Sequence, residues 1–343
     1  MRTFAGRSAA SRLALGIALA CLASTASAQF TVEEPSSVLI FPKVVCADTP
    51  ARDTVIQTTN TSNMMAYAHC FYTDGQSLNG VARWAVTDFP LSLTRQQTTT
   101  WSACSGRPLN PADSQLGIDP GSVPPVVSGF TGSLVCVQVD SPFEGAPSGA
   151  NNLTGRADVG GSGYNAVGLP AINAGADNVL DLDGVEYAQC PSSYHLNFAT
   201  NGSLGAVALG PMVGQGLGDA VATVSTSVTV VPCSFDFANL IPSRVNIGYN
   251  PIVDEMEDSG SQGTPDEVIC WDNLQLDSTG FELATSFGTA QVNGTDSTTG
   301  SPAPFVAVAS VLRVGGTSVG SDTATTNLHA VDGELANGQI ILP

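Results

Sequence analysis

The stretch ATVSTSVTVV, Ala222–Val231, carries the pattern that decides the fold class. Its even-numbered positions hold Ala, Val or Thr, and the odd-numbered positions up to 229 hold Thr or Ser. This period of two is typical of a strand in an antiparallel sheet, with one face buried and the other in water. Val and Thr are β-branched and favour strands over helices. We therefore predict a strand over Ala222–Val231.

The chain on both sides of this stretch consists of short β-rich segments separated by Gly, Pro, Asn and Asp. No amphipathic run of about twelve residues carries a capping residue and a closing glycine, so no long helix is predicted. Pro42 interrupts the first segment and indicates an edge strand or a bulge. We predict an all-β protein. The other predicted strands are Val38–Val45, Thr54–Thr59, Met65–Tyr72, Thr98–Trp101, Ser133–Val139, Arg244–Tyr249, Val268–Leu274 and Val306–Val314.

Two parts of the chain resemble each other and indicate a tandem organisation. Phe130–Val137 is followed by Asn-Leu 22 residues after its Phe, and Phe305–Leu312 is followed by Asn-Leu at the same interval. Two related β-sandwiches in tandem would produce this order. We predict a first β-sandwich domain at 29–160, a loop-rich connecting region with strands at 161–230 and a second β-sandwich domain at 231–343.

Two stretches rich in small residues are expected to form long loops. Ser141–Ala176 reads as loops that leave the first sandwich, and Thr200–Gly218 as a loop or a glycine-bearing hairpin. Long loops are often binding surfaces, although flexible padding is the more frequent case.

One segment resembles a known group of domains. Asp53–Ser62, an alternating strand that runs into Asn-Thr-Ser, is similar to strand B of many bacterial immunoglobulin-like domains. With Phe41–Val44, Val231–Cys233 and Ile340–Pro343, it makes most of the chain resemble exported bacterial proteins with such domains that are themselves uncharacterised. The resemblance implies two tandem immunoglobulin-like β-sandwiches in an exported chain, and it implies no activity.

The first 28 residues have the three parts of a secretory signal peptide. Three arginines form a positive start, about 11 apolar residues follow, and Ala26–Ala28 fits a cleavage site. That apolar run is too short to cross a bilayer, which needs about 20 residues. We predict a signal peptide at 1–28, no membrane span after its removal, and a mature protein that is secreted, at the cell surface or in the periplasm. Lipidation of Cys21 is an alternative, but the preceding residues fit a lipobox poorly.

The charge of the chain excludes several classes of partner. The net charge is −19, and removal of the three signal-peptide arginines takes it to −22. Lys43 is the only lysine. A nucleic-acid binder needs a basic patch, so we expect no nucleic-acid partner, and binding to anionic lipid is disfavoured for the same reason.

Seven cysteines follow residue 28, and none of them forms a C-x-x-C pair. This excludes zinc ribbons and thioredoxin-like sites, and in an exported protein it predicts disulfides. The odd number leaves at least one thiol free or paired between chains. Sequence does not decide the connectivity. Nearest-neighbour pairing, which leaves Cys270 over, would be Cys46–Cys70, Cys104–Cys136 and Cys190–Cys233.

Gly316–Gly320 matches the G-x-S-x-G nucleophile elbow of hydrolases, with Asp322 and His329 nearby. An elbow needs a helix after its serine, here Ser318, to present the hydroxyl above a parallel sheet. The sequence instead predicts a turn leading to another strand over Ser321–Asn327, so a glycine-rich hairpin turn explains the match. We predict no catalytic residue and no enzymatic activity.

The histidines and tryptophans are few and scattered. No two histidines have the sequence spacing of metal ligands, so we expect each to pack on a sheet face or at the surface. A three-histidine metal site stays an alternative. The tryptophans are expected to fill the cores, because a sugar-binding platform needs several exposed aromatics. These residues are His69, His195, His329, Trp84, Trp101 and Trp271.

Two acidic clusters are candidates for calcium, the only cofactor that the sequence suggests. Calcium takes six to eight oxygen ligands, and neither cluster fits an EF-hand loop. Solvated acidic loops are the favoured interpretation. Asp254 and Glu257 could form a glycosidase pair in principle, but both lie in one short loop. The candidate metal ligands are Asp177, Asp181, Asp183 and Glu186, with Asn178 beside them, and the second cluster is Asp254–Asp258.

These features predict an exported structural, adhesive or binding protein of the cell exterior, with a cell-surface protein or a glycan as its partner. The alternatives are a calcium-dependent carbohydrate-binding protein and a secreted hydrolase.

Overall fold

The computed structural model describes most of the chain after residue 33. The described residues are 34–48, 51–78, 81, 82, 84–142, 145, 147–170, 186–199, 202–204, 222–254, 256, 257, 259–261, 264–276, 287–314 and 322–343. Within them the protein is all-β, as predicted, and helix α1 (Pro111–Gln115) spans five residues. No helix in this part of the chain is long and apolar enough to cross a membrane.

The first half of the chain forms one sheet that folds back on itself. Its order is β10-β9-β2-β1-β8-β3-β6, with β11 beside β1 and β7 beside β2. β1 pairs with β8 over most of its length and with β2 only at Cys46–Asp48, so two layers meet at that strand and enclose a core. The strands are β1 (Val38–Asp48), β2 (Ala51–Asn60), β3 (Ala66–Asp74), β4 (Ser77–Leu78), β5 (Val81–Ala82), β6 (Val86–Leu93), β7 (Thr98–Ser102), β8 (Thr131–Val139), β9 (Leu153–Val159), β10 (Ser162–Asn165) and β11 (Val167–Leu169).

The second half encloses a core between two sheets, ordered β18-β17-β21-β13-β24 with β19 on β17, and β14-β15-β22-β23 with β20 on β15. A small third sheet has the order β12-β25-β16. The strands are β12 (Glu186–Pro191), β13 (Ser193–Ala199), β14 (Gly202–Leu204), β15 (Ala222–Pro232), β16 (Phe235–Asp236), β17 (Arg244–Asp254), β18 (Ser259–Gly260), β19 (Asp266–Ile269), β20 (Asp272–Gln275), β21 (Phe287–Thr295), β22 (Phe305–Val314), β23 (Asp322–Asn327), β24 (His329–Ala330) and β25 (Leu335–Ile341).

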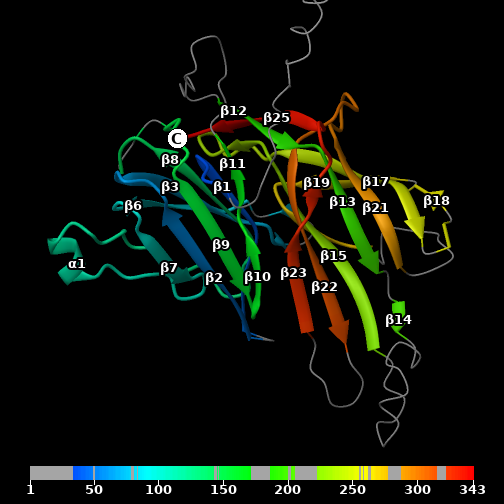
Figure 1. Cartoon of the computed structure of the whole chain (residues 1–343), viewed down its shortest axis with the longest axis horizontal. Helices are drawn as coiled ribbons and strands as arrows, with labels where there is room; N and C mark the ends of the chain where they lie inside the picture. Colours follow the sequence, from blue (N-terminus) through cyan, green and yellow to red (C-terminus); the bar gives the residue numbers. More distant parts are fainter. Residues whose placement is uncertain are drawn as a thin grey trace, which may run out of the picture.

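The two halves share a third core, which we call the seam. Figure 1 shows β12 and β25 lying across the top of both halves. Ile40 and Val137 of the first half pack there with Val306 of the second. The rings of Phe71 and Phe237 stack across the seam with centroids 4.0 Å apart.

The seam corrects the prediction that β15 has one wet face. The predicted apolar face is buried, but Thr229 on the opposite face is also buried and donates to Asn273 Oδ1 at 2.8 Å. β15 and β22 lie between the core of the second half and strand β1 of the first, so water reaches neither face at their centre. Alternation in the sequence indicates which side chains are polar, not which are exposed, and the Thr229 hydroxyl finds its hydrogen-bond partner inside the protein.

Three other local predictions can be compared with the structure. Pro42 lies at a register shift between Phe41 and Val44, so of the two predicted alternatives, an edge strand or a bulge, the structure shows the bulge. The predicted strand Val268–Leu274 is two strands, because Cys270 has φ +56° and breaks the extended backbone. The predicted loop Ser141–Ala176 is wrong between Leu153 and Leu169, where β9, β10 and β11 lie, because glycine and asparagine hid their alternation; its last residues, 171–176, lie outside the described residues.

The predicted domain limits, and the two similar parts of the sequence at 130–153 and 305–328, do not coincide with the strand pairing. The limit at 230/231 falls inside β15, and the limit at 160/161 separates β9 from its partner β10. β22 pairs directly with β23, whereas β8 and β9 have no such pairing with each other.

Three disulfides connect the described residues. Cys46 bonds to Cys104, Cys70 to Cys136, and Cys190 to Cys233. Two of the three nearest-neighbour pairings are therefore wrong, because strand order rather than sequence order brings the sulfurs together. Cys270 is free. Disulfides are typical of an oxidising environment outside the cytoplasm.

Candidate functional site

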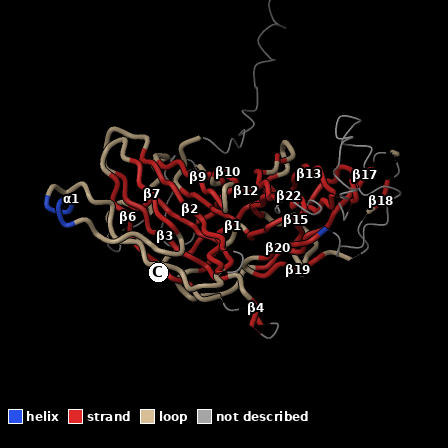
Figure 2. Tube along the Cα trace, turned by 90° about the horizontal axis from the view of Figure 1, so that it is seen from below, coloured by secondary structure: helices blue, strands red, loops and turns tan. Residues whose placement is uncertain are grey.

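The connection from β7 to β8 includes an excursion that we call the tip loop, residues 105–122. It contains α1, which lies at one end of the molecule in Figures 1 and 2, while β17 and β18 lie at the other. Asn110 caps the helix, because its side chain accepts a hydrogen bond from Ala112 N at 3.1 Å. Pro111 follows at the first helical position, where its missing N–H leaves no bond unmade.

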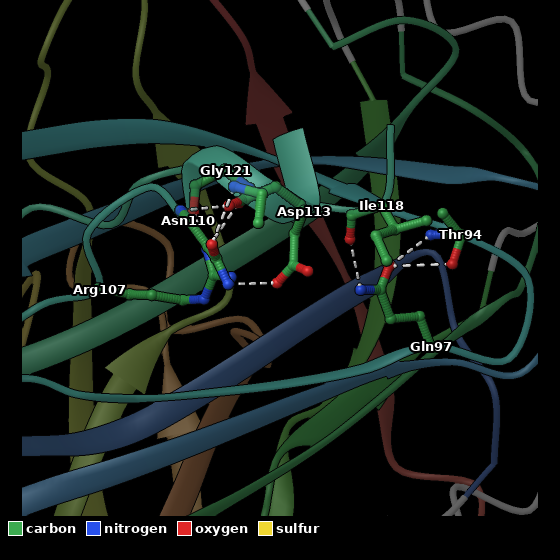
Figure 3. Close-up of polar contacts among 9 residues, drawn as sticks. Thr94, Gln97, Arg107, Asn110, Asp113, Ile118 and Gly121 are labelled. Carbon is green, nitrogen blue, oxygen red and sulfur yellow. Dashed lines mark hydrogen bonds and ion pairs between the residues drawn. The ribbon is translucent and has the colours of Figure 1, made fainter. Parts of the chain in front are cut away.

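A partly buried ion pair between Arg107 and Asp119 braces the base of the tip loop, and Figure 3 shows Arg107 beside Asn110 and Gly121. Arg107 Nη1 lies 2.8 Å from Asp119 Oδ1, and the Asp119 side chain is 3% exposed. The same carboxylate accepts hydrogen bonds from the backbone N–H groups of Gly121 and Asn110. Burial alone would raise the pKa of Asp119, but these hydrogen bonds, with that from Arg107 foremost, outweigh it and lower the pKa.

A second set of bonds ties the tip loop to the neighbouring strand connection. Gln97 Nε2 donates to Ile118 O at 2.8 Å, while Gln97 Oε1 accepts from Thr94 N at 2.8 Å (Figure 3). Gln96 N in turn donates to Ser62 O at 3.0 Å, so the turn after β2 lies beside this connection. Three loops are thus joined at this end of the molecule.

The braced loop presents apolar side chains to water. Leu116 is 71% exposed, Leu109 is 55% exposed and Ile118 is 41% exposed. Met64, in the turn after β2, is 74% exposed. Single exposed apolar residues are common, but several on adjoining loops of fixed conformation are typical of contact surfaces. This surface provides a fixed shape and apolar area for contact. The tip loop itself contains no His, Cys, Tyr or Lys that could act in catalysis.

The tip loop is absent from the predictions above, although the sequence carries a signal for it. Asn110 and Pro111 form a helix start, and Asp113 in the first turn fits the helix dipole. At five residues the helix is too short to show an amphipathic period. That leucines at 109 and 116 stay exposed follows from the tertiary structure alone.

The predicted calcium ligands are not brought together among the described residues. Asp177, Asp181 and Asp183 lie outside the described residues, while Glu186 begins β12 opposite Ile340. In the second cluster, Asp254 is buried at the end of β17 and accepts from Met256 N at 2.9 Å, so it shapes a turn. No group of three or more His, Cys, Asp or Glu in the described part of the chain is arranged to hold a metal.

No catalytic partner for the serine of the hydrolase motif can be identified among the described residues. Ser318 lies outside the described residues. Residues 322–327, read from the sequence as a turn leading to a strand, are themselves strand β23, so a strand and not a helix follows the motif. His329 follows in β24 and pairs with β13, where its direct neighbour is His195. His69, the third histidine, lies 2.9 Å from Asp88 in the first half.

The tryptophans do not form a platform. Trp101 is buried in the first core and donates to Tyr72 OH at 2.7 Å, as expected for a core residue. Trp271 reaches across the seam and donates to Pro42 O at 2.7 Å. Its ring lies over Gly75, where a Cβ atom would come within 2.4 Å, so only glycine fits.

A small pocket of about 30 Å³, partly open to solvent, lies at the edge of the seam. The hydroxyl of Thr73 lines it and has no hydrogen-bond partner among the described residues. Burial raises the pKa of the Cys270 thiol at its wall to about 12, which makes that thiol a poor nucleophile. The other lining residues include Trp84, Val86, Phe237, Leu240 and Ile241.

Comparison with known proteins adds no assignment. No protein-family model matches the chain, and no curated protein matches it. Function therefore has to follow from the geometry of the surface.

Proposed function

We propose that this protein is an exported, non-catalytic binding protein of the cell exterior, and that the tip loop contacts a partner protein. The observation that carries the proposal is a loop whose conformation is held by a partly buried ion pair while three aliphatic side chains face water. These side chains are Leu109, Leu116 and Ile118.

The bracing favours binding because it lowers the entropy lost on association. A loop that is already ordered does not have to be fixed when the partner arrives. Arg107 and Asp119 at the base, and Gln97 at the side, hold the loop from two directions. The exposed leucines would then act as anchors that enter an apolar depression on the partner.

The chemistry of the tip loop favours a protein partner over a glycan. Residues 105–122 contain no aromatic side chain, and aromatic rings are the groups that stack on sugars. The net charge of −19 would repel acidic polymers, so a neutral or basic protein surface fits best. Export is supported by the predicted signal peptide and by three disulfides.

A matched pair of substitutions tests the proposal. Leu116 is 71% exposed and Met256, in the turn after β17, is 68% exposed, so a glutamate should be tolerated equally at both. We expect Leu116→Glu to weaken binding of the purified protein to intact native cells about tenfold or more, and Met256→Glu to leave it unchanged. Protease treatment of the cells should abolish binding, because the proposed partner is a protein.

Equal binding by both variants, or binding that survives protease and is lost after glycosidase treatment, would overturn the proposal. The calcium alternative predicts a higher melting temperature in saturating calcium. The hydrolase alternative predicts turnover of polysaccharide or ester substrates that Ser318→Ala or Asp254→Asn abolishes.

A further inference from the structure

Two histidines that are far apart in the sequence face each other across neighbouring strands. His195 lies in β13 and His329 in the two-residue strand β24, and the antiparallel register places them directly opposite. Directly opposed residues of an antiparallel pair project from the same face of the sheet. Sequence spacing gave no hint of this neighbourhood, which the fold alone brings about.

Both imidazoles belong to the outer face of that sheet. The neighbours of His195, Tyr194 and Leu196, are buried in the second core. Leu328 and Ala330, on either side of His329, also pack against that core. Because side chains alternate along a strand, the two histidines point away from the core, and both are exposed.

The spacing of the two backbones suits a shared ligand. Val331 N donates to Ser193 O at 3.0 Å, two residues along from the histidine pair. The pair therefore occupies a hydrogen-bonded site, where Cα atoms are about 5.5 Å apart. Exposed imidazoles at that spacing can rotate so that one nitrogen of each lies about 2.0–2.1 Å from a common metal ion.

A hollow of about 300 Å³ lies beside His195 and leaves room for further ligands. Its walls include Asn197, Thr289 and Gln291, and none of the described residues that line it is a carboxylate. Gln291 is the residue opposite His195 on the other side, in β21. Without carboxylates the hollow is a poor site for calcium or magnesium, whereas imidazole nitrogen suits zinc, nickel and copper.

We propose that His195 and His329 together bind one late divalent transition-metal ion, such as Zn²⁺ or Ni²⁺, with its remaining coordination positions open to the hollow. The site lies in the second half of the molecule and does not depend on the tip loop or on the proposed partner. A bound ion would tie β24, which pairs with β13 at only two residues, to the centre of its sheet.

Calorimetric titration of the full chain with Zn²⁺ and Ni²⁺ tests the proposal, with Ca²⁺ as a comparison. We expect one ion per chain, and an affinity that falls about tenfold or more in His195→Gln and in His329→Gln, because either change leaves a single imidazole. His69→Gln removes the only other histidine and should bind the metal like the wild type.

The double variant His195→Gln/His329→Gln separates a shared site from two independent ones. A shared ion predicts that the second substitution weakens binding little beyond the first, whereas independent surface histidines predict two ions per wild-type chain and one per single variant, at unchanged affinity. Melting temperatures without metal confirm that each variant folds. If His195→Gln does not fold, His329→Gln in the short strand β24 provides the test alone. Equal affinity in His69→Gln and His329→Gln, two independent ions in place of one, or stronger binding of Ca²⁺ would overturn the proposal.

Discussion

Lys43, the only lysine of the chain, places a charged group at the contact between the two halves. Its Nζ lies 2.6 Å from Ser310 Oγ in the other half, and Ser310 Oγ lies 3.1 Å from Thr325 Oγ1. Burial, and to a smaller extent the charge of Arg52, lower the pKa of Lys43 from 10.5 to about 8. No carboxylate forms a salt bridge with it in the described part of the chain. The lysine therefore bridges the halves through hydroxyl groups, at the expense of a buried charge.

The lowered pKa of Lys43 predicts a dependence of stability on pH. Below pH 8 both folded and unfolded chains hold the proton, and the buried charge destabilises the fold in full. Between pH 8 and 10.5 the folded chain releases the proton first, so the penalty decreases as pH rises. The stability that Lys43→Met gains relative to the wild type should shrink between pH 7 and pH 10, by on the order of 3 kcal/mol. Urea unfolding of both proteins at each pH measures this, and a constant difference would contradict it.

The strands follow local patterns, but their partners do not follow sequence order. β2 and β8 were predicted from alternation within a few residues of their observed limits. β3 pairs with β8, which begins more than 50 residues later, and this register places Cys70 opposite Cys136. The disulfide closes a sequence separation of 66 residues. Loop closure of that length in the unfolded chain is the main source of its stabilisation.

The Cys70–Cys136 disulfide should therefore contribute more to the free energy of unfolding than the free thiol of Cys270 does. Replacing both residues by alanine is expected to lower the free energy of unfolding by about 3–4 kcal/mol. Cys270→Ser is the control, since it removes a sulfur but no cross-link, and should change stability by less than about 1 kcal/mol. Guanidinium unfolding under non-reducing conditions measures both. Equal losses of stability in the two variants would show that the disulfide does not stabilise the protein by closing a loop in the unfolded chain.

At the scale of the whole molecule, the seam makes two halves into one body. The third core contains side chains from β1, β8, β22 and β25 in a single cluster. Either half alone would expose its share of these apolar side chains to water. Residues 29–160 without the rest would also lack β10 and β11, which pair with β9 and β1.

The seam predicts that the protein unfolds in one cooperative transition. Phe237 is 7% exposed and stacks between Phe71 and Phe235, with centroid distances of 4.0 and 5.4 Å. Phe237→Ala should destabilise the whole molecule by about 3–5 kcal/mol and lower the melting temperature of both halves together. Scanning calorimetry measures this. Two separate peaks, of which only one moves in the variant, would show that the halves fold independently.

The sequence by itself determined the all-β class, the acidic charge and most strand positions, because these depend on composition and on contacts within a few residues. It also predicted the bulge at Pro42, since a missing N–H is a local property. The tertiary structure alone decided the disulfide partners, the burial of both faces of β15, the exposed leucines of the tip loop and the His195–His329 pair. Each of these depends on which distant strands lie side by side, and loop closure over tens of residues leaves no local pattern from which that order could be read.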